Sequence, residues 1–157
     1  MAKRMHSLEL KIPPPVVAAL AAAAMWGIEV LAPLVDAPAA IRVPLAIALA
    51  LTGAAFDVSG LIAFRRSKTT ANPMKPDKAA ALVCSGVYRL TRNPMYVGLA
   101  FVLVAWAVYL SCAWALLGPV AFVLYMNRFQ IQPEERVLAT LFGNRYEDYK
   151  SGVRRWL

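Results

Sequence analysis

Histidine and cysteine are scarce in this chain. Its 157 residues include one histidine, His6, and two cysteines, Cys84 and Cys112, with no CxxC spacing. The sequence therefore indicates neither a disulfide framework nor a metal site, since both need several such residues in a defined pattern. It also lacks a Ser/His/Asp or Cys/His set for nucleophilic catalysis. Any chemistry must come from carboxylates, arginines, tyrosines and a bound cofactor.

Acidic residues are also few, and apolar residues dominate. Hydrophobic residues make up 60% of the chain, whereas an ordinary soluble domain is about 45–50% apolar. We therefore expect an all-α integral membrane protein that forms a single domain over 1–157. Four crossings are predicted, the last two as a helical hairpin that turns at Ser111-Cys112-Ala113. Their expected bounds are about 13–35, 41–64, 94–111 and 113–131.

The basic residues predict an orientation. With four crossings, sixteen of the seventeen lysines and arginines fall on one side, and only Arg42 falls on the other. Cytoplasmic loops collect Lys and Arg, so both termini are predicted to be cytoplasmic, in a bacterial inner membrane. The net charge of +8 then follows from orientation and contact with membrane lipids. No nucleic-acid partner and no obligate protein partner are expected.

Two acids fall inside the predicted crossings, where ionisable groups are functional candidates. Glu29 lies toward the outer end, within reach of Arg42 across the first turn. Asp57 lies toward the inner end of the second crossing and is a candidate for substrate contact. A hydrogen-bond partner in the bundle interior is an alternative reason for either acid.

Two cytoplasmic segments carry the remaining polar chemistry, about 65–93 and 132–157. Asn93-Pro94 predicts a helix start, with Asn93 as N-cap and free amide groups facing the cytoplasm. Gln132-Pro133 predicts a second start, with Glu134 and Glu135 in its first turn. Both acids are explained by the helix dipole alone or by ligand binding. Gly143 is expected to end this helix.

The ordered combination of these segments resembles a known family. The stretch Thr91-Arg92-Asn93-Pro94-Met95-Tyr96-Val97-Gly98 is followed by Glu134-Glu135-Arg136, Phe142-Gly143 and Tyr146-x-x-Tyr149. Together they resemble the isoprenylcysteine carboxyl methyltransferases and, more broadly, the membrane methyltransferases that include phospholipid N-methyltransferases. The similarity runs from about Arg65 to the carboxyl end.

The resemblance implies a cofactor, S-adenosylmethionine, enclosed at the cytoplasmic end of the bundle. Its carboxylate, ammonium, sulfonium and adenine call for amide donors, an acid, aromatic faces and an apolar slot. The expected cofactor contacts are Leu82, Val83, Gly86, Tyr88, Asn93, Pro94, Tyr96, Gly98, Glu134, Tyr146 and Tyr149. Around the reacting atoms we expect Arg92, Glu135 and Arg154. We also expect Asp57 there, because it lies toward the inner end of the second crossing. Gly98 is equally explained by helix packing.

The acceptor implied is a lipophilic small molecule or a lipid that enters from the bilayer. Its accepting atom stays open, because Gly152 stands where the isoprenylcysteine enzymes carry a second substrate-binding arginine, which leaves Arg154 or Arg155 for that role. Which of Glu134 and Glu135 contacts the cofactor is also open. Two other classes compete, a nicotinamide-dependent membrane reductase and a noncatalytic lipid-binding membrane protein.

Overall fold

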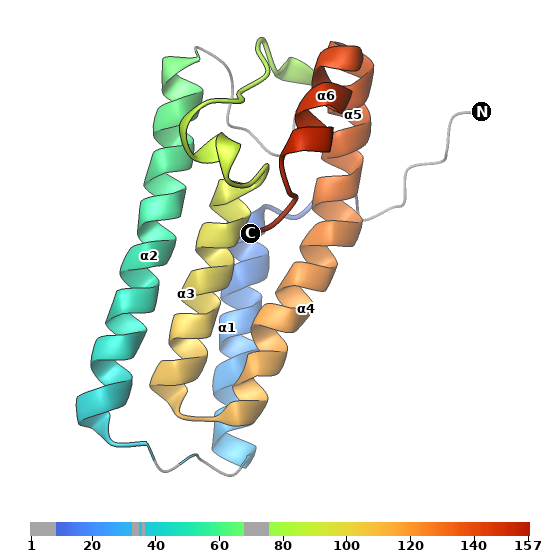
Figure 1. Cartoon of the computed structure of the whole chain (residues 1–157). Helices are drawn as coiled ribbons and strands as arrows, with labels where there is room; N and C mark the ends of the chain where they lie inside the picture. The colour runs from blue at the N-terminus through green and yellow to red at the C-terminus, as the bar shows by residue number, and fades with distance from the viewer. Residues whose placement is uncertain (1–8, 33–34, 36, 68–75) are drawn as a thin grey trace.

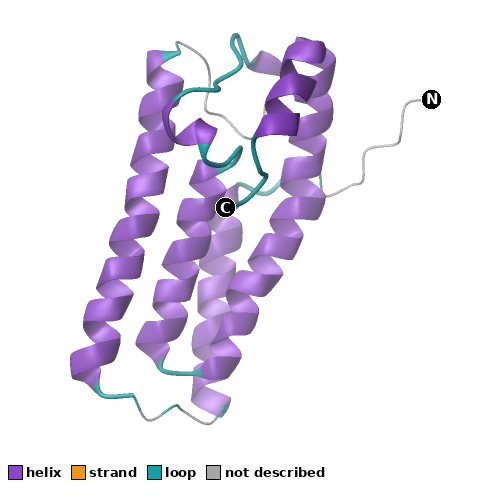
Figure 2. Cartoon of the chain, in the orientation of Figure 1, coloured by secondary structure: helices purple, strands orange, loops and turns teal. Residues whose placement is uncertain are grey.

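The chain folds into an elongated bundle of helices, shown in the computed structural model in Figures 1 and 2. The structure describes residues 9–32, 35, 37–67 and 76–157, and this part of the chain contains no strand. The four long elements are α1 (Pro14–Leu31), α2 (Ala39–Arg66), α3 (Pro94–Leu110) and a stretch made of the 3₁₀ turn η3 (Ala113–Leu116), α4 (Leu117–Tyr125) and the π-helical segment η4 (Met126–Ile131). The all-α prediction is confirmed for the described residues.

Shorter helices cover one end of this bundle. They are the 3₁₀ turns η1 (Pro76–Lys78) and η2 (Gly86–Arg89), α5 (Gln132–Phe142) and α6 (Asn144–Gly152). In Figure 1 they lie at the top, and the connections between α1 and α2 and between α3 and α4 lie at the bottom. The two segments predicted to carry the polar chemistry therefore meet at the same end.

Proline and glycine set most of the helix ends. Pro94 occupies the first position of α3, as predicted, where its missing N–H leaves no bond unmade. The carboxyl end of α3 is closed by Ser111 in the left-handed conformation at φ 54°. The first helix ends at Leu31, four residues before the predicted end, because Ala32 precedes a proline and adopts an extended conformation.

The core lies between α1, α3 and α4. Met25, Phe122, Leu103 and Met126 are at most 2% exposed and form its centre. A Cβ on residue 118 would overlap the Met25 side chain, so Gly118 is what lets α1 pack closely on α4. Close packing of this kind is the main source of helix association in lipid, where lipid tails compete for apolar surface.

The second helix is attached chiefly to α3 and is exposed over most of its surface. Its exposed side chains include Ile41, Leu45, Ile47, Leu51 and Val58. A helix that is apolar all round and exposed suits a lipid environment. By length and composition, α1 and α2 are both able to cross a membrane, and α3 is a shorter apolar helix.

The predicted helix start at Gln132-Pro133 is confirmed as the start of α5, with Glu134 and Glu135 in its first turn, but no break separates α5 from the helix before it. The backbone stays helical through α4, η4 and α5, with Tyr125 and Gln132 both in the right-handed helical region. In a continuous α-helix residue 133 would donate to the carbonyl of Phe129, which proline cannot do. The helix widens into a π-helical segment ahead of the proline, and the N–H of Leu10 donates to the Phe129 carbonyl at 3.0 Å.

Arg42, placed within reach of Glu29 by the sequence, contacts α3 instead. A guanidinium nitrogen of Arg42 donates to the carbonyl oxygen of Tyr109, and the guanidinium carbon lies 5.8 Å from the centroid of the Tyr109 ring. Arg42 thus ties the start of α2 to the end of α3, because the helix that packs on α2 is α3 and not α1.

Candidate functional site

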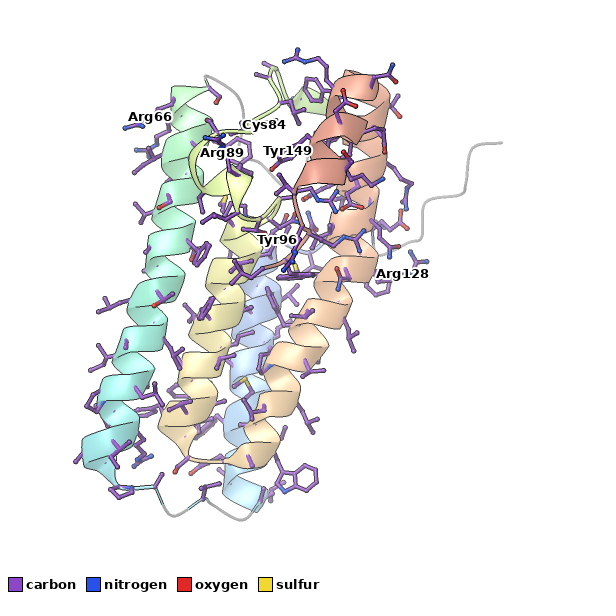
Figure 3. All side chains as sticks on the ribbon, in the orientation of Figure 1. Arg66, Cys84, Arg89, Tyr96, Arg128 and Tyr149 are labelled. Carbon is purple, nitrogen blue, oxygen red and sulfur yellow. The ribbon has the colours of Figure 1, made fainter. Side chains whose placement is uncertain are left out.

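A cavity of about 550 Å³ lies at the end of the bundle where residues 76–93, α5 and α6 meet. Figure 3 shows Tyr96 on α3 and Tyr149 on α6 at this end. The volume falls inside the range of about 300–1,000 Å³ that is usual for small-molecule sites. Its lining is mainly apolar, with a small set of polar side chains. The lining residues are Pro13, Pro14, Pro15, Asp57, Phe64, Pro76, Ala79, Ala81, Leu82, Val83, Tyr88, Arg92, Asn93, Met95, Tyr96, Leu99, Ile131, Glu134, Glu135, Leu138, Tyr146 and Tyr149.

One polar group in the lining is the carboxylate of Glu134. The Tyr96 hydroxyl donates to its Oε1 at 2.6 Å, and Nε2 of Gln130, one turn earlier, donates to the same oxygen at 2.7 Å. Burial raises the pKa of Glu134 to about 7, although both hydrogen bonds act to lower it. An acid with this pKa changes its charge readily when a cationic ligand approaches.

The neighbouring acid, Glu135, is fully engaged by two arginines. Arg155 donates through Nε to Oε1 at 3.0 Å and through Nη2 to Oε2 at 2.7 Å, which is a bidentate pair. Nη2 of Arg92 lies 3.2 Å from Oε1. Glu135 therefore joins the start of α3, the helix α5 and the carboxyl-terminal residues, whereas Glu134 faces the cavity with one oxygen engaged.

The Arg92 side chain is only 10% exposed and keeps donors to spare. Its Nε and Nη1 atoms are buried and have no hydrogen-bond partner among the described residues. Buried donors without partners are costly, so such a group in a cavity wall is suited to an anionic ligand. Glu135 therefore fixes the Arg92 side chain, while the Nε and Nη1 groups remain available to a ligand in the cavity.

The carboxyl-terminal residues are bound to the residues just before α3. The N–H of Arg92 donates to the carbonyl of Arg154 at 2.9 Å. The Arg155 carbonyl accepts from the Thr91 hydroxyl at 3.0 Å and from Nδ2 of Asn93 at 2.9 Å. The Asn93 side chain thus holds the chain end and makes no capping hydrogen bond to α3.

The helix start of α3 offers fewer amide donors than predicted. Pro94 has no N–H. The N–H groups of Tyr96 and Val97 both donate to the carbonyl of Asn93 at 3.0 Å. The first turn of α3 therefore leaves fewer amides free for a ligand than the sequence predicts.

Three tyrosines from η2 and α6 form the aromatic side of the cavity. The Tyr149 hydroxyl donates to the carbonyl of Tyr88 at 2.7 Å, and the rings of Tyr146 and Tyr149 are 6.5 Å apart. Phe64 on α2 meets the Tyr88 ring edge-on at 5.4 Å. Burial raises the pKa of Tyr146 to about 12 and raises that of Tyr88 and Tyr149 further, so all three remain protonated donors.

Comparison with known proteins identifies the family. The family model described as phospholipid methyltransferase matches residues 41–145, about two thirds of the chain. The chain belongs to the phospholipid methyltransferase family. It is therefore a member of a methyltransferase family with apolar helices suited to a membrane. An uncharacterized protein of Haemophilus influenzae is 46% identical over 63 residues, which span 40% of this chain and all of the relative. No solved structure matches the chain.

The cavity of this phospholipid methyltransferase family member contains most of the residues predicted from its sequence. The cavity lining includes Leu82, Val83, Tyr88, Arg92, Asn93, Tyr96, Glu134, Glu135, Tyr146, Tyr149 and Asp57. Tyr146, Tyr149 and the carboxyl-terminal residues lie beyond the matched range, as does the Pro13–Pro15 wall. The site is thus assembled from the family core and from both flanking segments.

Gly98 does not line the cavity and is a packing residue. A Cβ on residue 98 would overlap Oδ1 of Asp57 and lie 2.7 Å from the Gly53 carbonyl. The space beside Gly98 is therefore filled by α2, which corrects the prediction of a cofactor contact. The missing Cβ also leaves room for the Asp57 carboxylate, which has no hydrogen-bond or ion-pair partner among the described residues and borders the cavity.

Three other predicted residues are not in the cavity lining. Gly86 is exposed, and its φ of +61° serves the turn into η2. Pro94 is buried beneath the site as the first residue of α3. The Arg154 side chain is exposed, and its carbonyl accepts from the N–H of Arg92, whereas the Arg155 side chain pairs with Glu135.

Sequence reasoning missed two polar residues that organise the site. Gln130 is 1% exposed and Thr91 is fully buried. A signal for Gln130 was present, since a glutamine four residues before Glu134 shares its helix face. Thr91 gave no comparable signal, because its partner lies 64 residues away in the chain.

Proposed function

We propose that this protein is an S-adenosylmethionine-dependent methyltransferase embedded in the membrane. It transfers a methyl group to a lipophilic small molecule or a lipid. The cofactor enters the cavity from the cytoplasm, and the acceptor enters from the bilayer. The observation that carries the proposal is the Glu134 carboxylate, held by Tyr96 and Gln130 in a ligand-sized cavity of a methyltransferase family member.

The polar lining fits the ends of this cofactor. The unused Nε and Nη1 donors of Arg92 suit a carboxylate. Glu134 suits a cationic group, whose approach favours ionisation of an acid with a pKa near 7. Tyr88, Tyr146 and Tyr149 offer aromatic faces for adenine or the sulfonium. Leu82, Val83 and Leu138 supply the apolar slot.

The bound cofactor supplies a methyl group activated on a positively charged sulfur. The residues of this chain need only hold the reactants in line and keep water out, because alignment provides most of the acceleration in such a displacement. Glu135 fixes Arg92 and Arg155, and Tyr149 fixes η2 through the Tyr88 carbonyl. This arrangement requires no protein nucleophile.

We propose that Asp57 faces the acceptor. It comes from α2, lies beside Gly98 of α3 and borders the cavity, and its carboxylate has no partner among the described residues. A partly buried carboxylate inside an apolar helix is stabilised by a hydrogen-bond donor or a cation, which an acceptor provides. Substitution Asp57→Asn is expected to reduce methyl transfer and leave cofactor affinity unchanged.

We further propose that all four long helices cross the membrane and that both termini are cytoplasmic, in a bacterial inner membrane. The hydrocarbon core spans about 30 Å, or roughly 20 helical residues. The α3 helix and the η3 to η4 stretch approach this length, and the turn at Ser111 joins them at the end opposite the cavity. The cavity then lies at the cytoplasmic surface, among most of the basic residues.

Binding of S-adenosylhomocysteine, the demethylated form of the cofactor, tests this function. Thermal unfolding and calorimetry in detergent should show saturable stabilisation of the wild-type protein. Glu134→Gln should weaken binding at least tenfold, the factor that corresponds to about 1.4 kcal/mol. Glu147→Gln is the matched control, since Glu147 is an exposed acid on α6 outside the cavity lining. A folded wild-type protein that binds NADPH and not S-adenosylhomocysteine would overturn the proposal in favour of a reductase.

A further inference from the structure

The residues before α1 are tied to the outer face of η4 and α5. The side chain of Glu9 is only 3% exposed, and its two oxygens contact different arginines. Oε1 lies 3.3 Å from Nη1 of Arg128, and Oε2 accepts from Nη2 of Arg136. Figure 3 shows Arg128 on the outer side of the bundle. These two contacts link Glu9 to arginines that lie more than a hundred positions later in the chain.

A backbone contact reinforces the ion pairs. The N–H of Leu10 donates to the carbonyl of Phe129 at 3.0 Å, next to Arg128 in the π-helical segment. Leu10 has a φ of +57°, an uncommon conformation for a non-glycine residue. The bend at Leu10 directs the chain from the outer face of the helix toward the start of α1.

The other end of this segment forms a wall of the cavity. Pro13, Pro14 and Pro15 all line it, together with Ile131 and Leu138 on the helix that carries Arg128 and Arg136. One helix therefore binds Glu9 on one face and borders the cavity on another. Each proline has a fixed φ, so the wall is stiff and follows the position of Leu10.

We propose that Glu9 is a positioning residue of the methyltransferase site. The strap of residues 9–15 holds the triproline wall against the cavity and slows exit of the bound ligand. This inference rests on the proposed function, since it takes the cavity as the ligand site. The strap lies outside residues 41–145, the region that matches the family model.

The exposures of the partners predict that Glu9 variants fold. The side chains of Arg128 and Arg136 are 47% and 42% exposed, so water can replace the carboxylate. Removal of an arginine would instead leave the buried Glu9 with fewer partners, which costs more. Glu9→Ala is therefore the variant of choice, and Glu9→Asp tests whether a carboxylate alone rescues the effect.

The experiment measures the rate at which S-adenosylhomocysteine leaves the protein in detergent. Glu9→Ala should increase this rate about fivefold, a factor that corresponds to ~1 kcal/mol for a partly exposed ion pair. Glu9→Asp should recover part of the difference. Glu147→Ala is the matched control, because it removes an exposed ion pair, with Lys150, that lies away from the strap.

The salt dependence of release gives a second readout on the same two proteins. Raising the ionic strength from about 0.05 M to 0.5 M should speed release from the wild type, since charges on half-exposed arginines are screened, and should affect Glu9→Ala much less. An unchanged release rate in Glu9→Ala, with equal salt dependence in both proteins, would overturn the proposal that the strap slows ligand exit. The proposed function would be unaffected by that result. Absence of S-adenosylhomocysteine binding to the folded wild type would overturn both.

Discussion

At the level of single residues, the two adjacent acids of α5 have different surroundings. Glu134 faces the cavity with a raised pKa, whereas Glu135 is held by two arginines. The pair of acids is one short motif in the sequence, and helix geometry separates it into a ligand-facing member and a member that joins three segments. Substitution of each should therefore have a different effect.

The raised pKa of Glu134 predicts a stability that depends on pH. Its pKa is about 7 in the folded protein and 4.5 ordinarily, so the folded state binds the proton more tightly. Stability should thus fall as the pH rises from about 4.5 to 7, by up to about 3 kcal/mol. Glu134→Gln removes this loss, so the variant should be more stable than wild type at pH 8 and similar at pH 4.5. Parallel pH profiles of unfolding temperature would contradict this account.

Glu135→Ala should instead destabilise the protein. It leaves the Arg92 side chain, 10% exposed, without its carboxylate and releases Arg155. Breaking a buried ion pair costs about 3 kcal/mol or more. We expect a lower unfolding temperature in detergent at every pH, together with weaker S-adenosylhomocysteine binding. Glu147→Ala should change neither measurement.

Among the helices, the contact between α2 and α3 depends on glycine. Gly53 and Gly98 bring the two backbones together, and Asp57 occupies the space beside Gly98. The same glycine thus supports packing and admits a carboxylate at the cavity wall. Sequence alone left these two roles of Gly98 as alternatives, because the residue that fills the space comes from another helix.

Gly98→Ala should be strongly disruptive. The new Cβ would overlap Asp57 and approach the Gly53 carbonyl, and overpacking of this kind costs about 1–3 kcal/mol. Unfolding in detergent should report the loss. Gly27→Ala is the control, since a Cβ at residue 27 meets nothing within 4 Å. Equal stability of the two variants would show that α2 is not held this closely.

Local sequence signals predicted where the helices lie, but not how one helix continues into the next. Pro94 and Gly143 mark real helix boundaries. Pro133 gave the same signal as Pro94, yet it lies within a helix that continues through a π-helical segment. The Phe129 carbonyl there accepts from the N–H of Leu10, which lies far away in the chain. Local sequence carries no record of this partner.

For the whole molecule, the site is formed where both ends of the chain meet the family core. Motif order predicted Glu134, Tyr96 and the tyrosines of α6, which line one cavity. The roles of Arg155 and the triproline wall were not predictable, because they depend on how the flanking segments dock. The charge distribution predicts that this whole end is cytoplasmic.

A natural cysteine tests the orientation. Cys84 is exposed near the cavity end, and Cys112 is buried at the opposite end. A membrane-impermeant maleimide should label Cys84 in inverted vesicles and not in intact cells stripped of the outer membrane. Ala113→Cys, exposed at the α3 to α4 turn, should give the opposite pattern in a Cys84→Ala background. The reverse result would place the cavity outside the cell.

Methyl transfer itself is the most direct test of the central claim. Purified protein in native membrane lipid is incubated with methyl-labelled S-adenosylmethionine, and the solvent-extracted fraction is analysed for label. With S-adenosylmethionine kept below saturation, the account predicts a labelled lipophilic product with the wild type and with Glu147→Gln, and at least tenfold less with Glu134→Gln, since the expected loss of cofactor affinity is about 1.4 kcal/mol or more. Equal labelling by Glu134→Gln, or none by a folded wild-type protein, would contradict it.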